Sequence, residues 1–313
     1  MTRSKANDPH IDLGALQASA MEDELLGFRE KRLFVLTSLC VALWVYASSH
    51  AIAAPLEAGS HSNSACPSQG QAASTRIWVV AGQSQATTFG MNPSTLPATW
   101  LPDPQIRIWV SGVEPKPGRW ETYRAGVNSA PKGQWGPELQ LSSRLRREAP
   151  TTRVFIIKHA PGQTGVAFDP RENDWSPQSR GEAWERLRDM VRAALRTCGG
   201  QVETIFWMGN HNDGVRQEKA DRVAANMKLL IDLSRSEWGP QVNWVIGLPD
   251  DTAPYAPIVQ RELRALAASE PKISTFETAD YETQEDGLHY SARSVKRLGD
   301  EFFDGWKALA SGK

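Results

Sequence analysis

One serine, one histidine and one aspartate have the residue types and the spacing of a nucleophilic catalyst. Ser84 lies in Gly-Gln-Ser-Gln at residues 82–85, where a predicted strand gives way to a turn and the hydroxyl can face a cleft. A serine hydroxyl is a weak nucleophile until a base removes its proton, and His289 is the best base available. Asp286 lies three residues before His289, close enough to hold the imidazole in one tautomer and to stabilise the imidazolium. These residues predict attack on an ester carbonyl.

The tetrahedral intermediate of such an attack carries an oxyanion, which needs hydrogen-bond donors fixed in advance. Three donors follow predicted strands: the backbone N–H of Ser84, the backbone N–H of Gly162 and the side-chain amide of Asn212. In parallel α/β sheets ligands bind beyond the carboxyl ends of the strands, so polar residues at those ends are also candidates for substrate contact. We expect substrate contacts from Gln83, Gln85, Gln163 and His211.

Two histidines beside these segments raise the alternative of a metal centre. His159 and His211 could bind a metal ion together with Asp213, but no close ligand spacing supports such a site. We expect both histidines to form hydrogen bonds in the cleft, and we expect neither a metal nor a cofactor. Asp213 is expected to cap the turn before the next helix.

The chain has 12 tryptophans, which raises the question of stacking on sugar rings. Helical spacing assigns Trp184 and Trp306 to the core, and most of the others are expected there as well. Trp100, Trp135 and Trp175 fall on predicted loops. These three are the candidates for contact with a substrate.

The elements that position these residues alternate between short apolar runs and helical patterns, which is typical of an α/β domain. Six runs are apolar nearly throughout, as buried parallel strands are, at 76–81, 105–110, 153–158, 202–208, 242–248 and 273–276. Amphipathic stretches predict core-facing helices at 181–198, 219–238 and 291–309. The Gly- and Pro-rich stretch 112–134 predicts a loop or hairpin insertion. The predicted fold class is α/β, a three-layer α/β/α sandwich with a mainly parallel central sheet.

The composition limits the classes of protein to which the chain can belong. Its 313 residues are 40% hydrophobic and 23% charged, which predicts an enzyme-sized globular protein and not a disordered chain. With 35 Lys and Arg against 36 Asp and Glu, the chain has no polybasic character, and we expect no nucleic-acid partner. Three cysteines are too few for a disulfide-dense scaffold or a Cys-rich zinc module.

An export signal is predicted ahead of the α/β domain. Residues 30–32, Glu-Lys-Arg, precede an apolar stretch from Leu33 to Ala47, and residues 48–55 end in small residues and a proline. The stretch is shorter than the ~20 residues that span a bilayer, which favours cleavage near Ala53 over a permanent anchor. The predicted parts are therefore a tail with a signal peptide or signal-anchor at 1–54, a flexible linker at 55–75 and an esterase domain at 76–313. We expect a secreted or periplasmic protein, with membrane anchoring as the alternative.

Two features of this N-terminal region stay open at the level of sequence. The signal starts from either Met1 or Met21, because residues 21–32 would make a conventional if long segment before the apolar stretch. Cleavage near Ala53 would leave Cys66 and Cys198, which in an oxidising compartment form either a disulfide or two free thiols.

Taken together, the segments resemble the SGNH hydrolases, and within them the sialate O-acetylesterases and carbohydrate esterase family six. The resemblance covers roughly Arg76 to Trp306. It is carried by Gly-Gln-Ser-Gln at 82–85, Trp-Gly-Pro-Glu-Leu at 135–139, Ala-Pro-Gly-Gln-Thr at 160–164, Phe-Trp-Met at 206–208 leading to Asn-Asp at 212–213, and Asp-Gly-Leu-His at 286–289. It implies an SGNH-type, flavodoxin-like fold with Ser84 as nucleophile, His289 as base, Asp286 as its orienting acid, and Gly162 and Asn212 as oxyanion donors.

The chain departs from that group in two of these segments. Where the group usually has Gln-Gly-Glu, an alignment without gaps gives Gly209, Asn210 and His211. A carboxylate sometimes credited with supporting the histidine is therefore missing, which leaves Asp286 as the well-placed acid. Gln163 replaces the second glycine of a common Gly-Gly-Thr.

The resemblance implies an exported serine esterase that removes O-acetyl groups from a carbohydrate, of the sialate or acetylxylan type, through an acetyl-serine intermediate. One alternative is a polysaccharide O-acetyltransferase that uses the same triad. Another is a non-catalytic carbohydrate-binding relative, which the altered residues 209–211 make conceivable. The expected partner is an acetylated carbohydrate, with no stable membrane partner unless the signal is uncleaved.

Overall fold

A computed structural model describes residue 66 and residues 75–111, 118–129, 131–170, 173–179, 182–250 and 252–312. All of them belong to one compact unit, residues 62–313. The predicted tail and signal peptide at 1–54, and nearly all of the linker at 55–75, lie outside the described residues. Within the described ranges, no helix has the length and apolar character needed to cross a membrane.

The described residues form a seven-stranded sheet with β1 at its centre, in the order β3-β2-β4-β1-β5-β6-β7. All neighbouring strands are parallel except β2 and β3, which form an antiparallel pair at one edge. The strands are β1 (Arg76–Gly82), β2 (Ile106–Val110), β3 (Arg119–Thr122), β4 (Val154–His159), β5 (Gln201–Met208), β6 (Asn243–Gly247) and β7 (Ile273–Phe276). Because β1 lies between β4 and β5, the segments that follow these three strands meet at one edge of the sheet.

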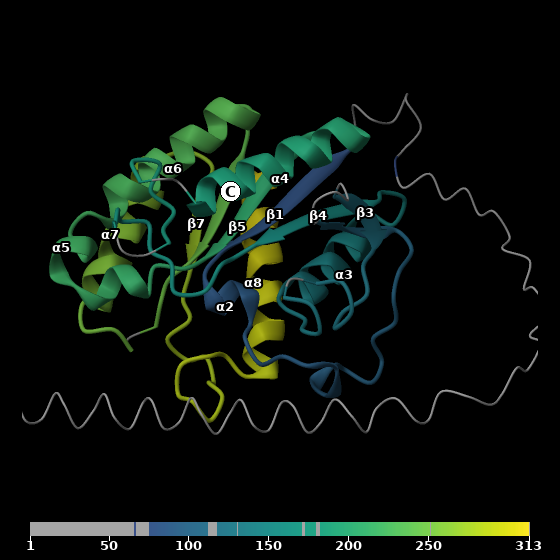
Figure 1. The fold of residues 1–313 in the computed structure, drawn as a ribbon, viewed down its shortest axis with the longest axis horizontal. Coiled ribbons are helices and arrows are strands. Elements are labelled where there is room, and N and C mark those ends of the chain that lie inside the picture. The colour runs from purple at the N-terminus through teal and green to yellow at the C-terminus, as the bar shows by residue number, and fades with distance from the viewer. Residues whose placement is uncertain are drawn as a thin grey trace, which may run out of the picture. The chain divides into compact units, whose positions relative to one another are not determined.

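Helices cover both faces of this sheet and complete three layers (Figure 1). One core lies between the sheet and α4 (Glu182–Cys198), α6 (Val223–Trp238) and α7 (Ala256–Ser269). The other core lies between the opposite face and α3 (Glu138–Glu148) and α8 (Ala292–Ala310). Short helices follow strand ends: α2 (Ser84–Thr87), η2 (Pro93–Thr95), η3 (Asn212–Val215) and α5 (Gln217–Ala220).

The predicted fold class is confirmed, and each of the six predicted strands is present within one or two residues of its expected bounds. The insertion at 112–134 contains a strand, β3, which makes it a hairpin with β2. Two helices were not identified by their periodicity, α3 and α7. The helix predicted from residue 219 begins later, at Val223, because residues 217–220 form the separate short helix α5.

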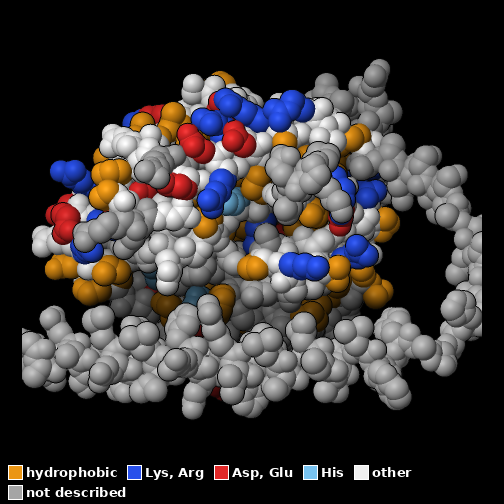
Figure 2. Space-filling model, viewed as in Figure 1, with side chains coloured by type: hydrophobic (Ala, Val, Ile, Leu, Met, Phe, Trp, Pro, Cys, Tyr) orange, Lys and Arg blue, Asp and Glu red, His pale blue; other side chains and the backbone are white. Residues whose placement is uncertain are grey.

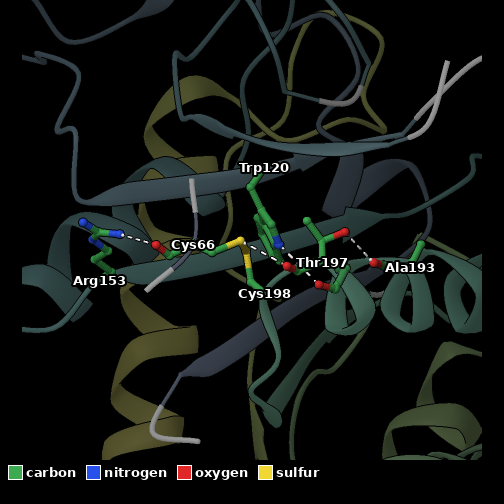
Figure 3. The surroundings of a disulfide bond; sticks show 7 residues. Cys66, Trp120, Arg153, Ala193, Thr197 and Cys198 are labelled. Carbon is green, nitrogen blue, oxygen red and sulfur yellow. Dashed lines mark hydrogen bonds between the residues drawn. A yellow bond between two sulfur atoms is a disulfide. The ribbon is translucent and has the colours of Figure 1, made fainter. Parts of the chain in front are cut away.

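A disulfide joins Cys66 to Cys198, the last residue of α4, with 5.0 Å between the two Cα atoms (Figure 3). The sequence left open whether these two cysteines form a disulfide or two free thiols. The structure shows the disulfide. The backbone carbonyl of Cys66 also accepts a hydrogen bond from Arg153 Nη1 at 3.3 Å. Both contacts fasten the chain ahead of β1 to the amino-terminal edge of the sheet.

The surface carries both signs of charge side by side. Over α4, basic and acidic side chains lie next to one another (Figure 2). Several of them are paired, as in Arg192 with Glu237 at 2.5 Å and Arg188 with Asp189 at 3.5 Å. Over α4 the two signs of charge are therefore interspersed, which agrees with the balanced composition.

Candidate active site

The end of β1 approaches the end of β5 so closely that only glycine fits between them. Gly82 has φ +130, and a Cβ at this position would overlap the carbonyl oxygen of Met208. The next residue, Gln83, donates its backbone N–H to the same carbonyl oxygen at 2.9 Å. The chain then turns directly into α2, with Ser84 as its first residue.

Two buried glutamines hold the hydroxyl of Ser84. Ser84 Oγ donates to Gln85 Oε1 at 3.1 Å, and Gln83 Nε2 donates to the same oxygen at 3.0 Å. Gln83 and Gln85 are almost fully buried, whereas Ser84 is partly exposed. Among the described hydrogen bonds, Ser84 Oγ has none to His289. Transfer of its proton to the imidazole therefore requires the hydroxyl to turn away from Gln85.

His289 and Asp286 form a tight pair on the loop that leads into α8. His289 Nδ1 lies 2.6 Å from Asp286 Oδ2, and Asp286 Oδ1 accepts the backbone N–H groups of Leu288 and His289, both at 2.9 Å. The hydrogen bond from the His289 side chain, followed by the two backbone N–H groups, lowers the pKa of Asp286 to about 2. Asp286 is therefore an ionised acceptor at neutral pH, which fixes the proton of the neutral imidazole on Nδ1.

The histidine loop lies against the segment that follows the serine helix. The ring of Phe89, two residues after α2, is centred 5.2 Å from the ring of His289. Gln284 Nε2 donates to the carbonyl oxygens of Phe89 at 2.8 Å and of Tyr290 at 3.0 Å. These contacts bring the first and last of the sequence segments to the same edge of the sheet.

The three predicted oxyanion donors are free to bind a ligand. A Cβ on Gly162 would lie 3.7 Å from Ser84 Cβ, so the glycine segment lies directly beside the serine. The N–H of Ser84 stands at the first position of a helix, where no intrahelical partner exists. In the described part of the chain, no hydrogen bond uses the N–H of Ser84, the N–H of Gly162 or the side-chain amide of Asn212.

Asp213 ties the segment after β5 to the glycine segment after β4. Its buried carboxylate accepts the backbone N–H groups of Val166 and Ala167 at 3.0–3.1 Å and Asn210 Nδ2 at 3.2 Å. Burial raises the pKa of Asp213 in spite of these hydrogen bonds. Asp213 was expected to cap the turn before the next helix, but its acceptors bind the N–H groups of the loop after β4 instead. Gly165 leaves room for this contact, since a Cβ there would lie 2.9 Å from Asp213 Oδ1.

The tryptophans predicted on loops support the site from within the core. Trp175 is 1% exposed, and its Nε1 donates to the carbonyl oxygen of Gly82 at 3.1 Å and to Thr164 Oγ1 at 3.0 Å. Trp135 is equally buried. Both side chains are packed in the core, which leaves little of their surface for contact with a substrate. Trp100 packs edge-on against Tyr123, with ring centres 5.9 Å apart.

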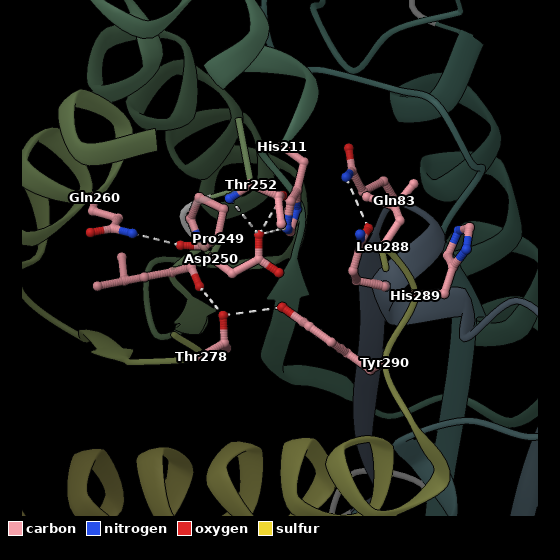
Figure 4. Close-up of polar contacts among 12 residues, drawn as sticks. Gln83, His211, Pro249, Asp250, Thr252, Gln260, Thr278, Leu288, His289 and Tyr290 are labelled. Atoms are coloured by element: carbon pink, nitrogen blue, oxygen red, sulfur yellow. Dashed lines mark hydrogen bonds and ion pairs between the residues drawn. The ribbon is translucent and has the colours of Figure 1, made fainter. Parts of the chain in front are cut away.

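His211 lies next to a carboxylate that no sequence pattern identified. Its Nε2 is 3.3 Å from Asp250 Oδ1, beyond the end of β6 (Figure 4). That contact lacks the alignment of a hydrogen bond, and both ring nitrogens are buried without a hydrogen-bond partner in the described part of the chain. Burial raises the pKa of Asp250, but His211 and Thr252 outweigh it and leave this pKa below its ordinary value. Asp250 therefore stays ionised beside the ring.

The remaining candidates occupy different environments. Gln163 is exposed and has a left-handed backbone, φ 59, so its side chain is the most accessible of the four predicted substrate contacts. His159 packs edge-on against Trp175, and burial, with a smaller effect from Arg186, lowers its pKa to about 4. A search of the described residues finds no cluster of three metal-ligating side chains.

These contacts bring all four sequence segments to the carboxyl edge of the sheet. At this edge Gly162 lies beside Ser84, and the loop with the His289–Asp286 pair lies against Phe89, in the segment that follows Ser84. Such a set can support formation and breakdown of a tetrahedral intermediate at an ester. Fold and site together define a three-layer α/β protein with serine, histidine and aspartate at the carboxyl edge of its sheet.

Comparison with known proteins identifies the family. The model of the family "Carbohydrate esterase, sialic acid-specific acetylesterase" matches residues 74–307. The chain belongs to this carbohydrate esterase family, which confirms the resemblance inferred from its motifs. A search of curated proteins gave no match.

Solved structures share the fold at low sequence identity. A protein of Arabidopsis thaliana has a TM-score of 0.64 at 17% identity, covering 75% of this chain and 98% of its own. NanS has a TM-score of 0.57 at 13% identity, and the match covers 76% of this chain and 98% of NanS. A carbohydrate acetylesterase from Xanthomonas citri has a TM-score of 0.54 at 12% identity, covering 76% of this chain and 56% of its own. At these identities the likeness concerns the fold alone.

Proposed function

We propose that this protein is an exported serine esterase that removes O-acetyl groups from a carbohydrate. The observation that carries the proposal is the 2.6 Å contact between Asp286 and His289, on a loop packed against the segment of Ser84. Membership of the carbohydrate esterase family supports the substrate class. The acetylesterase from Xanthomonas citri that shares the fold is described as acting on carbohydrates.

In the first half of the proposed reaction, Ser84 Oγ attacks the acetyl carbonyl carbon while His289 Nε2 takes the hydroxyl proton. The resulting oxyanion accepts hydrogen bonds from Ser84 N–H, Gly162 N–H and the Asn212 amide. The carbon–oxygen bond to the sugar then breaks, and His289 returns the proton to the departing sugar oxygen. Asp286 stabilises the imidazolium throughout, and the product on the enzyme is acetyl-Ser84.

In the second half, His289 removes a proton from water, which attacks the acetyl-serine carbonyl carbon. Collapse of the second tetrahedral intermediate breaks the bond to Ser84 Oγ, and the proton returns from His289 to this oxygen. Acetate leaves and the serine is restored. No metal or cofactor is needed for any of these steps.

Export of the protein is part of the same proposal. The apolar stretch from Leu33 to Ala47 with small residues after it fits a cleaved signal. The Cys66–Cys198 disulfide is typical of an oxidising compartment, because cytosolic thiols are kept reduced. N-terminal sequencing of the protein recovered outside the cytoplasm tests this part, and an intact N-terminus there would contradict cleavage.

The proposed activity is tested by measuring acetate release from acetylated xylan, O-acetylated sialic acid and p-nitrophenyl acetate. We expect wild-type turnover on at least one sugar ester and loss of nearly all activity in Ser84→Ala. Wild-type rates in Ser84→Ala would refute the triad. Acetylated acceptor sugar in place of free acetate would indicate the transferase, and failure of a serine-directed phosphonate to label Ser84 would indicate a non-catalytic binding protein.

A further inference from the structure

The motif Trp-Gly-Pro-Glu-Leu at 135–139 has no place in the mechanism, yet it supplies half of a buried ion pair. Glu138, the first residue of α3, has its Oε2 2.9 Å from Lys158 Nζ on β4. Both side chains are at most 1% exposed. Tyr123 Oη donates to the other carboxylate oxygen of Glu138 at 3.3 Å. The pair lies on the sheet face covered by α3 and α8. Lys158 points to the same face as Ile156 and Ala160, two residues before and after it, and both belong to that core.

The ammonium of this pair reaches the helix that carries the nucleophile. Lys158 Nζ donates to the backbone carbonyl oxygen of Thr87 at 3.1 Å. Thr87 is the last residue of α2, and Ser84 is the first. The carbonyls in the last turn of a helix lack an intrahelical partner, and the ammonium supplies a charged donor to this one. The Thr88 hydroxyl lies 2.5 Å from the same oxygen. One turn of helix, roughly 5 Å, separates this contact from the serine.

Neighbouring hydrogen bonds converge on the same turn. Thr87 Oγ1 donates to the carbonyl oxygen of Ala160, two residues before Gly162. Thr88 has a left-handed backbone, φ 63, and its Oγ1 donates to the carbonyl oxygen of Trp135 at 2.5 Å. Gly136 carries no side chain here, because a Cβ would lie 2.5 Å from Lys158 Nζ and 2.6 Å from Glu138 Oε2. The motif therefore packs directly around the end of α2.

Stability alone does not account for a pair in this position. Burial lowers the pKa of Lys158, which shows the cost of removing an ammonium from water. Replacing a buried ion pair by apolar side chains of similar volume is often neutral or stabilising. An apolar pair, however, offers no donor to the Thr87 carbonyl. What the charged pair adds is a fixed hydrogen bond at the end of the serine helix.

We propose that Glu138 and Lys158 are positioning residues for the nucleophile. Glu138 anchors the ammonium of Lys158, and the ammonium fixes the Thr87 carbonyl, which sets the orientation of α2 and of Ser84 relative to Gly162 and His289. Neither side chain touches the substrate. The catalytic part of this inference rests on the proposed esterase function, whereas the fixing of α2 is independent of it.

The decisive variant is the double substitution Glu138→Leu/Lys158→Met, because either single change leaves a buried charge without a partner and destabilises the fold. We expect the double variant to keep its thermal midpoint within a few degrees. Its kcat on p-nitrophenyl acetate should fall about 10- to 100-fold with KM changed less than about threefold, since a displacement of roughly 1 Å at a reacting group costs on the order of 10² in rate. Phosphonate labelling of Ser84 should slow by a similar factor.

Hydrogen exchange gives a readout that does not depend on activity. The amides of Thr87 and Thr88 donate to the carbonyls of Gln83 and Ser84. In the double variant we expect them to exchange at least about tenfold faster, because the end of α2 is released. The matched control is Arg146→Met on the same helix α3. Arg146 pairs with Asp103 at 3.0 Å and donates to the carbonyl of Thr152, away from α2. This control should change neither α2 exchange nor kcat.

The outcomes separate the positioning role from the esterase proposal. Unchanged exchange of α2 in the double variant would overturn the positioning role, whatever happens to kcat. Unchanged kcat alongside faster exchange would overturn its catalytic part. If the wild-type protein neither hydrolyses acetyl esters nor reacts with the phosphonate, the esterase proposal fails, and faster exchange in the double variant would still support the fixing of α2.

Discussion

Replacing Asp286 by asparagine should reverse the proton arrangement of His289 without dismantling its loop. Asp286 Oδ1 accepts two backbone N–H groups and Oδ2 meets His289 Nδ1 at 2.6 Å. The amide oxygen of asparagine can keep both backbone contacts. Its NH₂ group is then directed at Nδ1, which must accept a hydrogen bond and so places the imidazole proton on Nε2. An imidazole with that proton on Nε2 has no lone pair left there for the proton of Ser84.

The size of the effect follows from the exposure of the carboxylate. In a buried triad, the corresponding change lowers kcat by about 10⁴. The side chain of Asp286 is 46% exposed, against 15% for His289. Water can therefore compete for Nδ1 and restore part of the productive tautomer, and solvent screens the charge. We expect kcat to fall on the order of 10²–10³ in Asp286→Asn, with KM changed little.

The assay is steady-state hydrolysis of p-nitrophenyl acetate, with thermal unfolding to confirm that the loop is intact. Asp280→Asn is a suitable control, because Asp280 is an exposed carboxylate of the same connection and pairs with Arg297 at 2.7 Å. Its turnover should equal that of the wild-type protein. If Asp286→Asn retains more than about one tenth of wild-type kcat, Asp286 is not the acid that orients His289, and the reasoning is refuted.

The remaining predictions concern the oxyanion donors, acid stability and the disulfide. Asn212→Ala should lower kcat by ~10²–10³ at nearly constant KM, and unchanged turnover would exclude its amide as a donor. The pKa of Asp286 is below its ordinary value of 3.8, so the ionised carboxylate contributes stability above pH 4, and this contribution is lost as pH falls through about 2. The thermal midpoints of wild type and Asp286→Asn should therefore converge as the pH is lowered from 4 to 2. Midpoints that diverge over this range would contradict the stabilising role of the carboxylate. Reducing the Cys66–Cys198 bond should lower the free energy of unfolding by about 2–5 kcal/mol in urea titrations, whereas an unchanged midpoint would show that it constrains nothing.

The strands were predictable because buried parallel strands are apolar on both faces, and six of them stand out as uninterrupted runs. Strand β3 has the sequence Arg-Trp-Glu-Thr within a Gly- and Pro-rich stretch, so only one of its four side chains carries an apolar signal. Helix α7 begins between Pro254 and Pro257, and two of its alanines, Ala265 and Ala268, lie on its exposed side. Both features obscure the start and the period of the helix in the sequence. The hydrophobic pattern of the sequence therefore predicts strands that are buried on both faces, and it predicts elements at the margins of the sheet poorly.

The residues of the candidate site were predictable as far as they follow strands, since the carboxyl ends of parallel strands meet at one edge. The partner of His211 was not, because Asp250 follows β6 in a segment without a motif and lies 39 positions further along the chain. The sequence also could not show that Ser84 Oγ is held by Gln85, or that Asp213 binds the N–H groups of Val166 and Ala167. These contacts depend on side-chain directions between distant segments.

The position of the disulfide has a practical consequence for immobilising or labelling this protein. Cys66 is bonded where α4 ends and β5 begins, and β5 pairs with the first residue of β1 at that same edge. Ser84 follows the far end of β1, and this seven-residue strand is roughly 23 Å long at 3.3 Å per residue. A resin, fusion partner or fluorescent label tethered to the chain through Cys66 would thus be attached at the end of the sheet remote from Ser84.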